Sequence, residues 1–168
     1  MNALKIIKLN AEHHGINTVA KWIFNEWGNT VAKWIFNEWG HLRPGNTLDK
    51  TIHQLQDGLR DNIVPSIYLA EMDSKHLGTV SLVECDMHIR QQYAPWVASV
   101  YVDTEWRNQG IGSKLMNHVE SQAKNDDIKK AYLYTPNKQK MYSRLGWHGI
   151  EELEYLGNNV TIMIKNLT

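Results

Sequence analysis

Apolar side chains recur every second residue in some stretches of the chain, which predicts strands, and every third or fourth residue in others, which predicts helices. Apolar and polar residues alternate over residues 98–103, as in a strand, and apolar residues recur at helical spacing over residues 111–119. Strands are expected at residues 3–9, 66–71, 77–85, 98–103, 130–134, 150–155 and 160–164, and helices at residues 17–40, 48–59, from 111 to about 124, and around 142. The order β-α-α-β-β-β-α-β-α-β-β predicts an α/β (α+β) fold, with a mixed sheet of about six to seven strands and about four helices. We expect residues 1–168 to form a single domain.

The helical region at residues 17–40 is a perfect tandem repeat, because residues 17–28 recur unchanged as residues 29–40. At 3.6 residues per turn, a shift of twelve residues rotates the apolar stripe by about 120°. One straight helix would then carry two apolar faces, of which a single core buries one. Gly28 and Asn29 suit a helix end and a new N-cap, so we predict a break near Gly28. The copy outside the parental position would extend over the surface or form a homodimer contact, and the sequence does not say whether the duplication is natural or introduced.

The predicted strand at residues 98–103 and the helix from residue 111 are joined by the segment Arg107-x-x-Gly110-x-Gly112. Glycine lets a ligand approach the backbone, the first helical N–H groups lack partners in the chain, and the helix dipole favours negative charge. Arg107 adds a cation suited to phosphate. The segment is not a P-loop, which needs Gly-x4-Gly-Lys-Ser/Thr, nor a dinucleotide fingerprint, because Leu115 stands where a third glycine is needed. The sequence therefore predicts a pyrophosphate-binding loop.

This segment resembles the acetyl-CoA signature of the GNAT superfamily of N-acetyltransferases. Tyr142 followed by Leu145-Gly146-Trp147 is similar to a second superfamily segment, Tyr-x-x-Leu-Gly-Phe, in the same order along the chain. The resemblance implies the GNAT fold and an enzyme that moves an acetyl group from acetyl-CoA to a primary amine of a small molecule or peptide by direct attack. Narrower or rival interpretations are an aminoglycoside-type antibiotic acetyltransferase, a non-catalytic acyl-CoA-binding module, and a fold whose acceptor wall the duplication has displaced.

The resemblance also implies which residues bind coenzyme A. The pantetheine arm would pair with the strand at residues 98–102, and the backbone N–H groups after it would hold the phosphates. The expected contacts are Val100, Tyr101, Val102, Arg107, Asn108, Gln109, Gly110, Ile111, Gly112, Ser113 and Asn137.

The catalytic candidates are a tyrosine and two carboxylates. By resemblance Tyr142 is the general acid that protonates the leaving thiolate, and a phenol with a pKa near ~10 suits that role; otherwise it is a packing residue. Glu84 and Asp86 are candidates for the base, acting directly or through a water, or they attract a cationic acceptor instead. If the strand continued through both, they would share a face, and two close carboxylates would raise one pKa. Cys85 would point to the opposite face and be buried.

The acceptor wall of the family is built from the helices after the first strand, which makes Trp34, Glu38, Trp39 and His41 the substrate-binding candidates. The tryptophans are core residues in the alternative interpretation.

Composition narrows the remaining choices. The 18 basic and 18 acidic residues balance, which argues against bulk attraction to nucleic acid or membrane. One cysteine suits a reducing compartment, and neither a signal peptide nor a run of ~18 apolar residues is evident, so we expect a cytoplasmic protein. The 8 histidines lack the spacing of a metal motif, and we expect no metal site.

Overall fold

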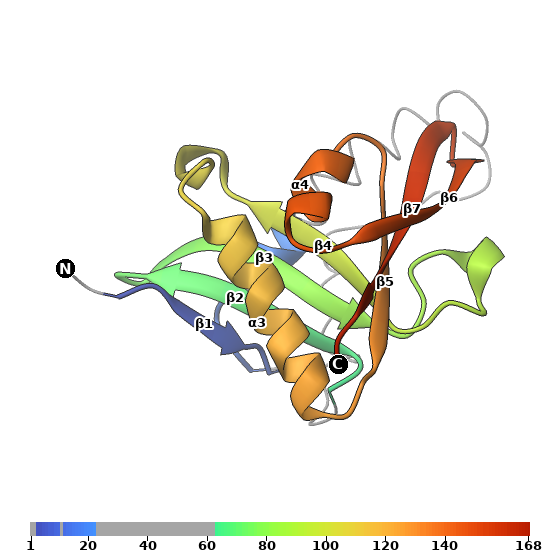
Figure 1. Cartoon of the computed structure of the whole chain (residues 1–168). Coiled ribbons are helices and arrows are strands. Elements are labelled where there is room, and N and C mark those ends of the chain that lie inside the picture. Colours follow the sequence, from blue (N-terminus) through green and yellow to red (C-terminus); the bar gives the residue numbers. More distant parts are fainter. Residues whose placement is uncertain (1–2, 11, 23–62) are drawn as a thin grey trace, which may run out of the picture.

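The computed structural model describes residues 3–10, 12–22 and 63–168. Its elements follow the predicted order (Figure 1). They are β1 (Lys5–Lys8), a helix at residues 16–22, β2 (Ser66–Met72), β3 (Lys75–Val83), the short 3-10 turn η2 (His88–Arg90), β4 (Trp96–Val102), the 3-10 turn η3 (Thr104–Trp106), α3 (Ile111–Asn125), β5 (Lys130–Thr135), α4 (Gln139–Arg144), β6 (His148–Tyr155) and β7 (Asn158–Asn166). The described chain thus has three α-helices, whereas about four were expected. The predicted break near Gly28, the second repeat copy and the helix at residues 48–59 lie outside the described residues.

The strands form one mixed sheet in the order β1-β2-β3-β4-β5-β7-β6. Neighbouring strands are antiparallel except β4 and β5, which run parallel and pair only at Trp96 and Tyr132. The prediction of a mixed sheet of six to seven strands is confirmed. The sheet is therefore two antiparallel halves that meet at one backbone pairing.

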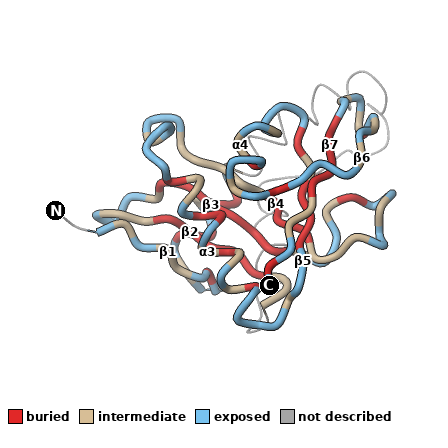
Figure 2. The backbone as a smooth tube through the Cα atoms, viewed as in Figure 1, coloured by how far each residue is buried: buried red, intermediate tan, exposed pale blue. Residues whose placement is uncertain are grey.

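Both faces of the first half of the sheet are covered, because successive residues of β2 point to opposite faces. Tyr68 and Ala70 pack into the same cluster as the apolar stripe of α3. Ile67 and Leu69 pack with Val19 of the helix at residues 16–22. Figure 1 shows α3 crossing the front of β2 and β3, and Figure 2 shows buried residues running along these strands.

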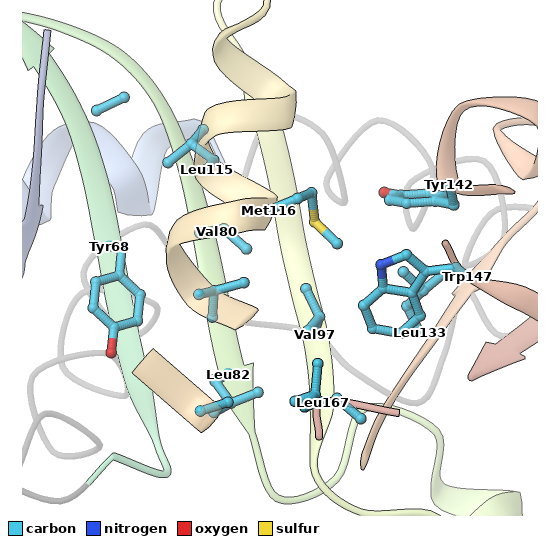
Figure 3. Packing of buried hydrophobic residues seen from close by; sticks show 14 of the residues in the cluster. Tyr68, Val80, Leu82, Val97, Leu115, Met116, Leu133, Tyr142, Trp147 and Leu167 are labelled. Carbon is cyan, nitrogen blue, oxygen red and sulfur yellow. The ribbon is translucent and has the colours of Figure 1, made fainter. Parts of the chain in front are cut away.

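The core also joins the two halves of the sheet through α3. Trp147, fully buried, packs in the same cluster as Leu115 and Met116 of α3 and Leu133 of β5 (Figure 3). Its indole N–H donates to Glu120 Oε1 at 2.8 Å, so the buried polar atom is satisfied. The second half of the sheet is thus held to the first mainly by side-chain packing.

The hairpin between β2 and β3 is tighter than predicted, because residues 72 and 75–76 belong to its strands. Only Asp73 and Ser74 form the turn, with φ of 52° and 60°, as a two-residue hairpin loop with left-handed residues requires. This turn places Glu71 opposite His76 in the register of the two strands.

The other end of β3 is shorter than predicted. It stops at Val83, which pairs with Trp96, the first residue of β4, so no described strand pairs with residues 84 and 85. Strand alternation therefore does not reach Glu84 and Asp86, and the expected burial of Cys85 is wrong because this residue is exposed.

Candidate active site

A pocket of about 410 Å³ opens where β4 and β5 separate. The two strands pair at Trp96 and Tyr132 and diverge toward their carboxyl ends, the edge at which open α/β sheets bind ligands. The walls come from residues 97–101 of β4, residues 133–138 of β5 and the loop after it, Tyr142 of α4, Tyr155, Asn158 and Val160 of the last hairpin, and Trp22 and Asp86.

A β-bulge in β4 accounts for part of this separation. Between Ala98 and Tyr101 the strand takes three steps, whereas β3 takes two between Ser81 and Thr79. Ser99, the non-glycine residue at φ 52°, lies within the extra step. Because a bulge bends its strand, it carries β4 away from β5, and residues 98–101 line the pocket that opens there. Of the predicted pantetheine contacts, Val100 and Tyr101 line the pocket and Val102 does not.

The loop after β4 has the predicted strand–turn–helix form. Gly110, at φ 77°, is the N-cap of α3. A Cβ at Gly110 would meet no atom within 4 Å, and one at Gly112 would lie an ordinary 3.6 Å from Val102 Cγ2. The start of this 15-residue helix is therefore open to a ligand, and the dipole and free N–H groups there suit an anion. Residues 107–113 line no part of the pocket but directly follow the strand that forms its wall.

Arg107 holds this loop against the strand. Its Nε donates to the carbonyl oxygen of Val102 at 2.9 Å, and its guanidinium lies 5.5 Å from the centroid of the Tyr101 ring. The side chain remains exposed. The cation therefore sits next to both the helix N-terminus and the pocket residue Tyr101, a position that can serve a phosphate.

Tyr142 lies in the wall of the pocket, on the short helix α4. Only 7% of the residue is exposed, and it packs in the cluster that contains Trp147 and Leu133 (Figure 3). This burial raises the pKa of Tyr142 to about 12. The phenol is therefore protonated throughout the neutral range and can act only as a proton donor there. Asn137, another predicted residue, also lines the pocket.

Of the two predicted carboxylates, the structure brings only Asp86 to the pocket. Burial raises the pKa of Asp86 to about 6, so the group can accept or release a proton near neutrality. Glu84 is exposed and outside the described lining of the pocket. The expectation that a carboxylate pair raises one pKa is corrected, because β3 ends before Glu84 and burial alone raises the pKa of Asp86.

Two tyrosines that the sequence analysis missed surround Asp86. Tyr134 and Tyr155 line the pocket with their ring centroids 5.5 Å apart. Burial is the largest cause that raises the pKa of both phenols, and the charge of Asp86 raises both further, although a hydrogen bond with His88 lowers that of Tyr155. The Tyr155 hydroxyl lies 2.9 Å from His88 Nδ1. The period of two along β5, which places Tyr132 and Tyr134 on one face, is the signal that would have found the first of them.

The predicted acceptor residues Trp34, Glu38, Trp39 and His41 lie outside the described residues. Trp22 lines the pocket, with its ring centroid 5.3 Å from that of Tyr101. Trp22 holds in the first repeat copy the position that Trp34 holds in the second. The first repeat copy thus contributes a tryptophan to the pocket wall, the residue type that was expected there from the second copy.

Comparison with known proteins identifies this arrangement. A family model described as an acetyltransferase (GNAT) domain matches residues 65–148, which is half of the chain. The chain belongs to the GNAT acetyltransferase family. Its members use acetyl-CoA and transfer the acetyl group to an acceptor. No curated protein matches the chain.

Solved structures agree with the family in fold. A GNAT-family acetyltransferase from Staphylococcus aureus Mu50 superposes with a TM-score of 0.67 at 20% identity, over 99% of this chain and 100% of the other. An N-acetyltransferase from the same strain gives 0.74 at 17% identity, over 99% of each chain. The Salmonella typhimurium protein yncA, solved with its cofactor acetyl-CoA, gives 0.72 at 16% identity, over 99% and 95%. None of the described helices is both long and apolar enough to cross a membrane.

Proposed function

We propose that this GNAT protein acetylates a primary amine of a small molecule or peptide, with Tyr142 as general acid and Asp86 as general base. The observation that carries the proposal is the pocket at the separation of β4 and β5, because both side chains line it. Near neutral pH Asp86, with its pKa raised to about 6, can accept a proton, and Tyr142, with its pKa raised to about 12, still carries the proton that it would donate.

The described residues fit coenzyme A at two places. The open helix start at Gly110 and Gly112 suits the phosphates. The bulged stretch of β4 offers backbone groups to an extended pantetheine arm, as an added strand would use them. Acetyl-CoA supplies an acetyl thioester, and its reaction with an amine forms an amide and releases the CoA thiol.

The protein's own groups would manage the protons of this reaction. Asp86, ionised above its pKa of about 6, takes a proton from the acceptor ammonium or amine, directly or through a water. Tyr142 gives its proton to the departing sulfur. Exchange with solvent then returns the proton from Asp86 and restores the Tyr142 phenol, so each turnover leaves the protein unchanged.

Thermal unfolding and thiol release test the function together. Acetyl-CoA at about a hundredfold excess over its dissociation constant should stabilise the protein by about 2.7 kcal/mol. A panel of small amines, polyamines, aminoglycosides and peptides should then contain an acceptor class that releases free thiol. Stabilisation without thiol release from any amine would contradict catalysis and favour a binding module. The absence of both would contradict the assignment of the cofactor site.

The helix start can be tested separately with Gly112→Val. Because a Cβ at this position makes only an ordinary contact with Val102, the free protein should unfold within a few degrees of the wild type. The added methyl groups should block the close approach of a phosphate to the first turn of α3 and weaken acetyl-CoA binding by at least about tenfold, or ~1.4 kcal/mol. Asn117→Val, at an exposed position of the same helix, is the matched control. If calorimetry gave the same acetyl-CoA affinity for both variants, the phosphates would have to bind at a place other than the start of α3.

A further inference from the structure

A second group of polar side chains lies outside the pocket, at the turn between β2 and β3. Glu71 and His76 face each other across this hairpin, and His14 approaches from the segment before the helix at residues 16–22. Glu71 Oε2 is 3.7 Å from His14 Nε2 and 3.5 Å from His76 Nε2. Three potential ligand atoms thus converge from two parts of the chain that are distant in sequence.

Two of these atoms are buried and, among the described residues, make no hydrogen bond. Glu71 Oε2 and His76 Nε2 make no hydrogen bond among the described residues, although a buried acceptor without a partner is costly. The other ring nitrogen of His76, Nδ1, lies 2.9 Å from Thr18 Oγ1. When Nε2 carries the proton, its N–H faces Glu71 Oε2 at 3.5 Å without forming a hydrogen bond. When Nδ1 carries the proton and donates it to Thr18, Nε2 presents a lone pair toward the carboxylate. Two electron-rich atoms then face each other, an arrangement that a cation between them would relieve.

The His76 side chain is only 13% exposed, so its Nε2 faces Glu71 in a position largely closed to solvent. A neutral imidazole is the form that binds a metal.

The separations match those of a metal site. Nitrogen and oxygen ligands about 2.1 Å from a Zn²⁺ ion lie roughly 3.4–3.6 Å from one another in tetrahedral or trigonal geometry. The two separations of 3.5 and 3.7 Å are close to this range, and all three ligand atoms lie within 4.8 Å of one another. The His14 side chain is 71% exposed and has room to adjust. Thr18 provides the outer hydrogen bond that usually orients a metal-binding histidine.

We propose that His14, Glu71 and His76 bind a divalent transition metal ion, with Zn²⁺ as the best match, and that water completes the coordination. The expectation of no metal site rested on spacing along the sequence, whereas these ligands meet only across the hairpin. The metal would fasten the segment at residues 13–18 to the hairpin. Trp22 follows Thr18 by one helical turn and lines the pocket, so the metal would also hold this part of the pocket wall.

The test uses residues 1–168 without an affinity tag, first stripped of metal with a chelator. Titration with Co²⁺ should give the visible absorption of a tetrahedral complex at one equivalent, and Zn²⁺ should displace it. Zn²⁺ should also raise the unfolding temperature. His14→Ala should weaken Zn²⁺ binding by at least about tenfold, and its fold should persist because His14 is exposed. His148→Ala, at an exposed histidine of β6, should bind as the wild type does.

Two results would overturn the proposal. One is wild-type protein that takes up no Zn²⁺ at micromolar concentration. The other is equally tight binding in the wild type and in both His14→Ala and Glu71→Gln, which would place any bound ion at other residues. Neither result bears on acetyl transfer, because the metal readouts require no acceptor and no acetyl-CoA.

Discussion

Replacing Tyr142 by phenylalanine should lower kcat by about 10²–10⁴-fold, the usual contribution of a general acid, while acetyl-CoA binding changes by less than about threefold. The hydroxyl that is removed belongs to a side chain in the pocket wall, and its pKa of about 12 keeps it protonated at the pH of the assay. The ring remains and still fills its place in the core. Steady-state kinetics and calorimetry with acetyl-CoA would measure the two effects separately.

The matched control for this substitution is Tyr132→Phe. Tyr132 is buried on β5 and does not line the pocket. The kcat of the Tyr132→Phe variant should therefore stay close to that of the wild type. If Tyr142→Phe also kept the wild-type kcat, the tyrosine would be a packing residue and another group would protonate the sulfur. Loss of acetyl-CoA affinity without a change in kcat would equally contradict the catalytic role.

Replacing Asp86 by asparagine should lower kcat by about 10²–10⁴-fold and remove a limb from the pH profile. In the wild type the base must be ionised, so kcat/KM, which reports the pKa values of the free enzyme, should rise with pH and level off above the pKa of about 6. The acceptor amine itself titrates near ~10, well above this limb. The limb should be absent in Asp86→Asn, because the amide does not titrate. Rates measured from pH 5 to 8 would show both effects.

The control for Asp86 is Glu84→Gln, which removes an exposed carboxylate outside the pocket lining. It should retain the wild-type rate and the limb near pH 6. Equal rates in the wild type and Asp86→Asn would exclude Asp86 as the base, and a large loss in Glu84→Gln would transfer the role to Glu84.

Stability provides a second readout for the same carboxyl group. Its folded pKa of about 6 lies above the ordinary aspartate pKa of 3.8, so the folded state holds the proton more tightly than the unfolded state. The stabilisation is fully present below the unfolded pKa and is lost as pH rises through about 6. In Asp86→Asn, denaturant unfolding should lose this part of the pH dependence.

The features that the sequence predicted correctly are those that short stretches of chain determine. The period of two before residue 103, the helical period after residue 111 and the glycines between them fix the strand, turn and helix without help from distant residues. Gly110 has the positive φ of 77° that this turn uses. For the same reason the order of the elements was predictable.

The incorrect predictions concern features that depend on contacts between distant parts of the chain. Alternation alone extended β3 to residue 85, whereas the strand ends at Val83 because its partner β4 begins opposite it, at Trp96. The placement of Glu84 and Asp86 depended on this end. The grouping of Asp86 with Tyr134 and Tyr155 needs three separate segments to meet, and that of His14 with Glu71 and His76 needs an N-terminal segment to meet the β2–β3 hairpin. Because the two repeat copies are identical, no local signal distinguishes Trp22 from Trp34.

The parting of β4 and β5 also bears on self-association. An unpaired strand edge invites another sheet to add to it, and proteins usually protect such edges at the outer rim. Here the two unpaired edges face each other inside the sheet, with Trp22, Tyr134 and Tyr142 around the gap. A strand that belongs to another sheet has a neighbouring strand ~4.8 Å to its side. Together they are too wide to enter the gap, whereas a single extended chain can enter it. The gap can therefore keep unpaired backbone N–H and C=O groups available to a narrow ligand without making the protein prone to edge-to-edge aggregation at this point of the sheet.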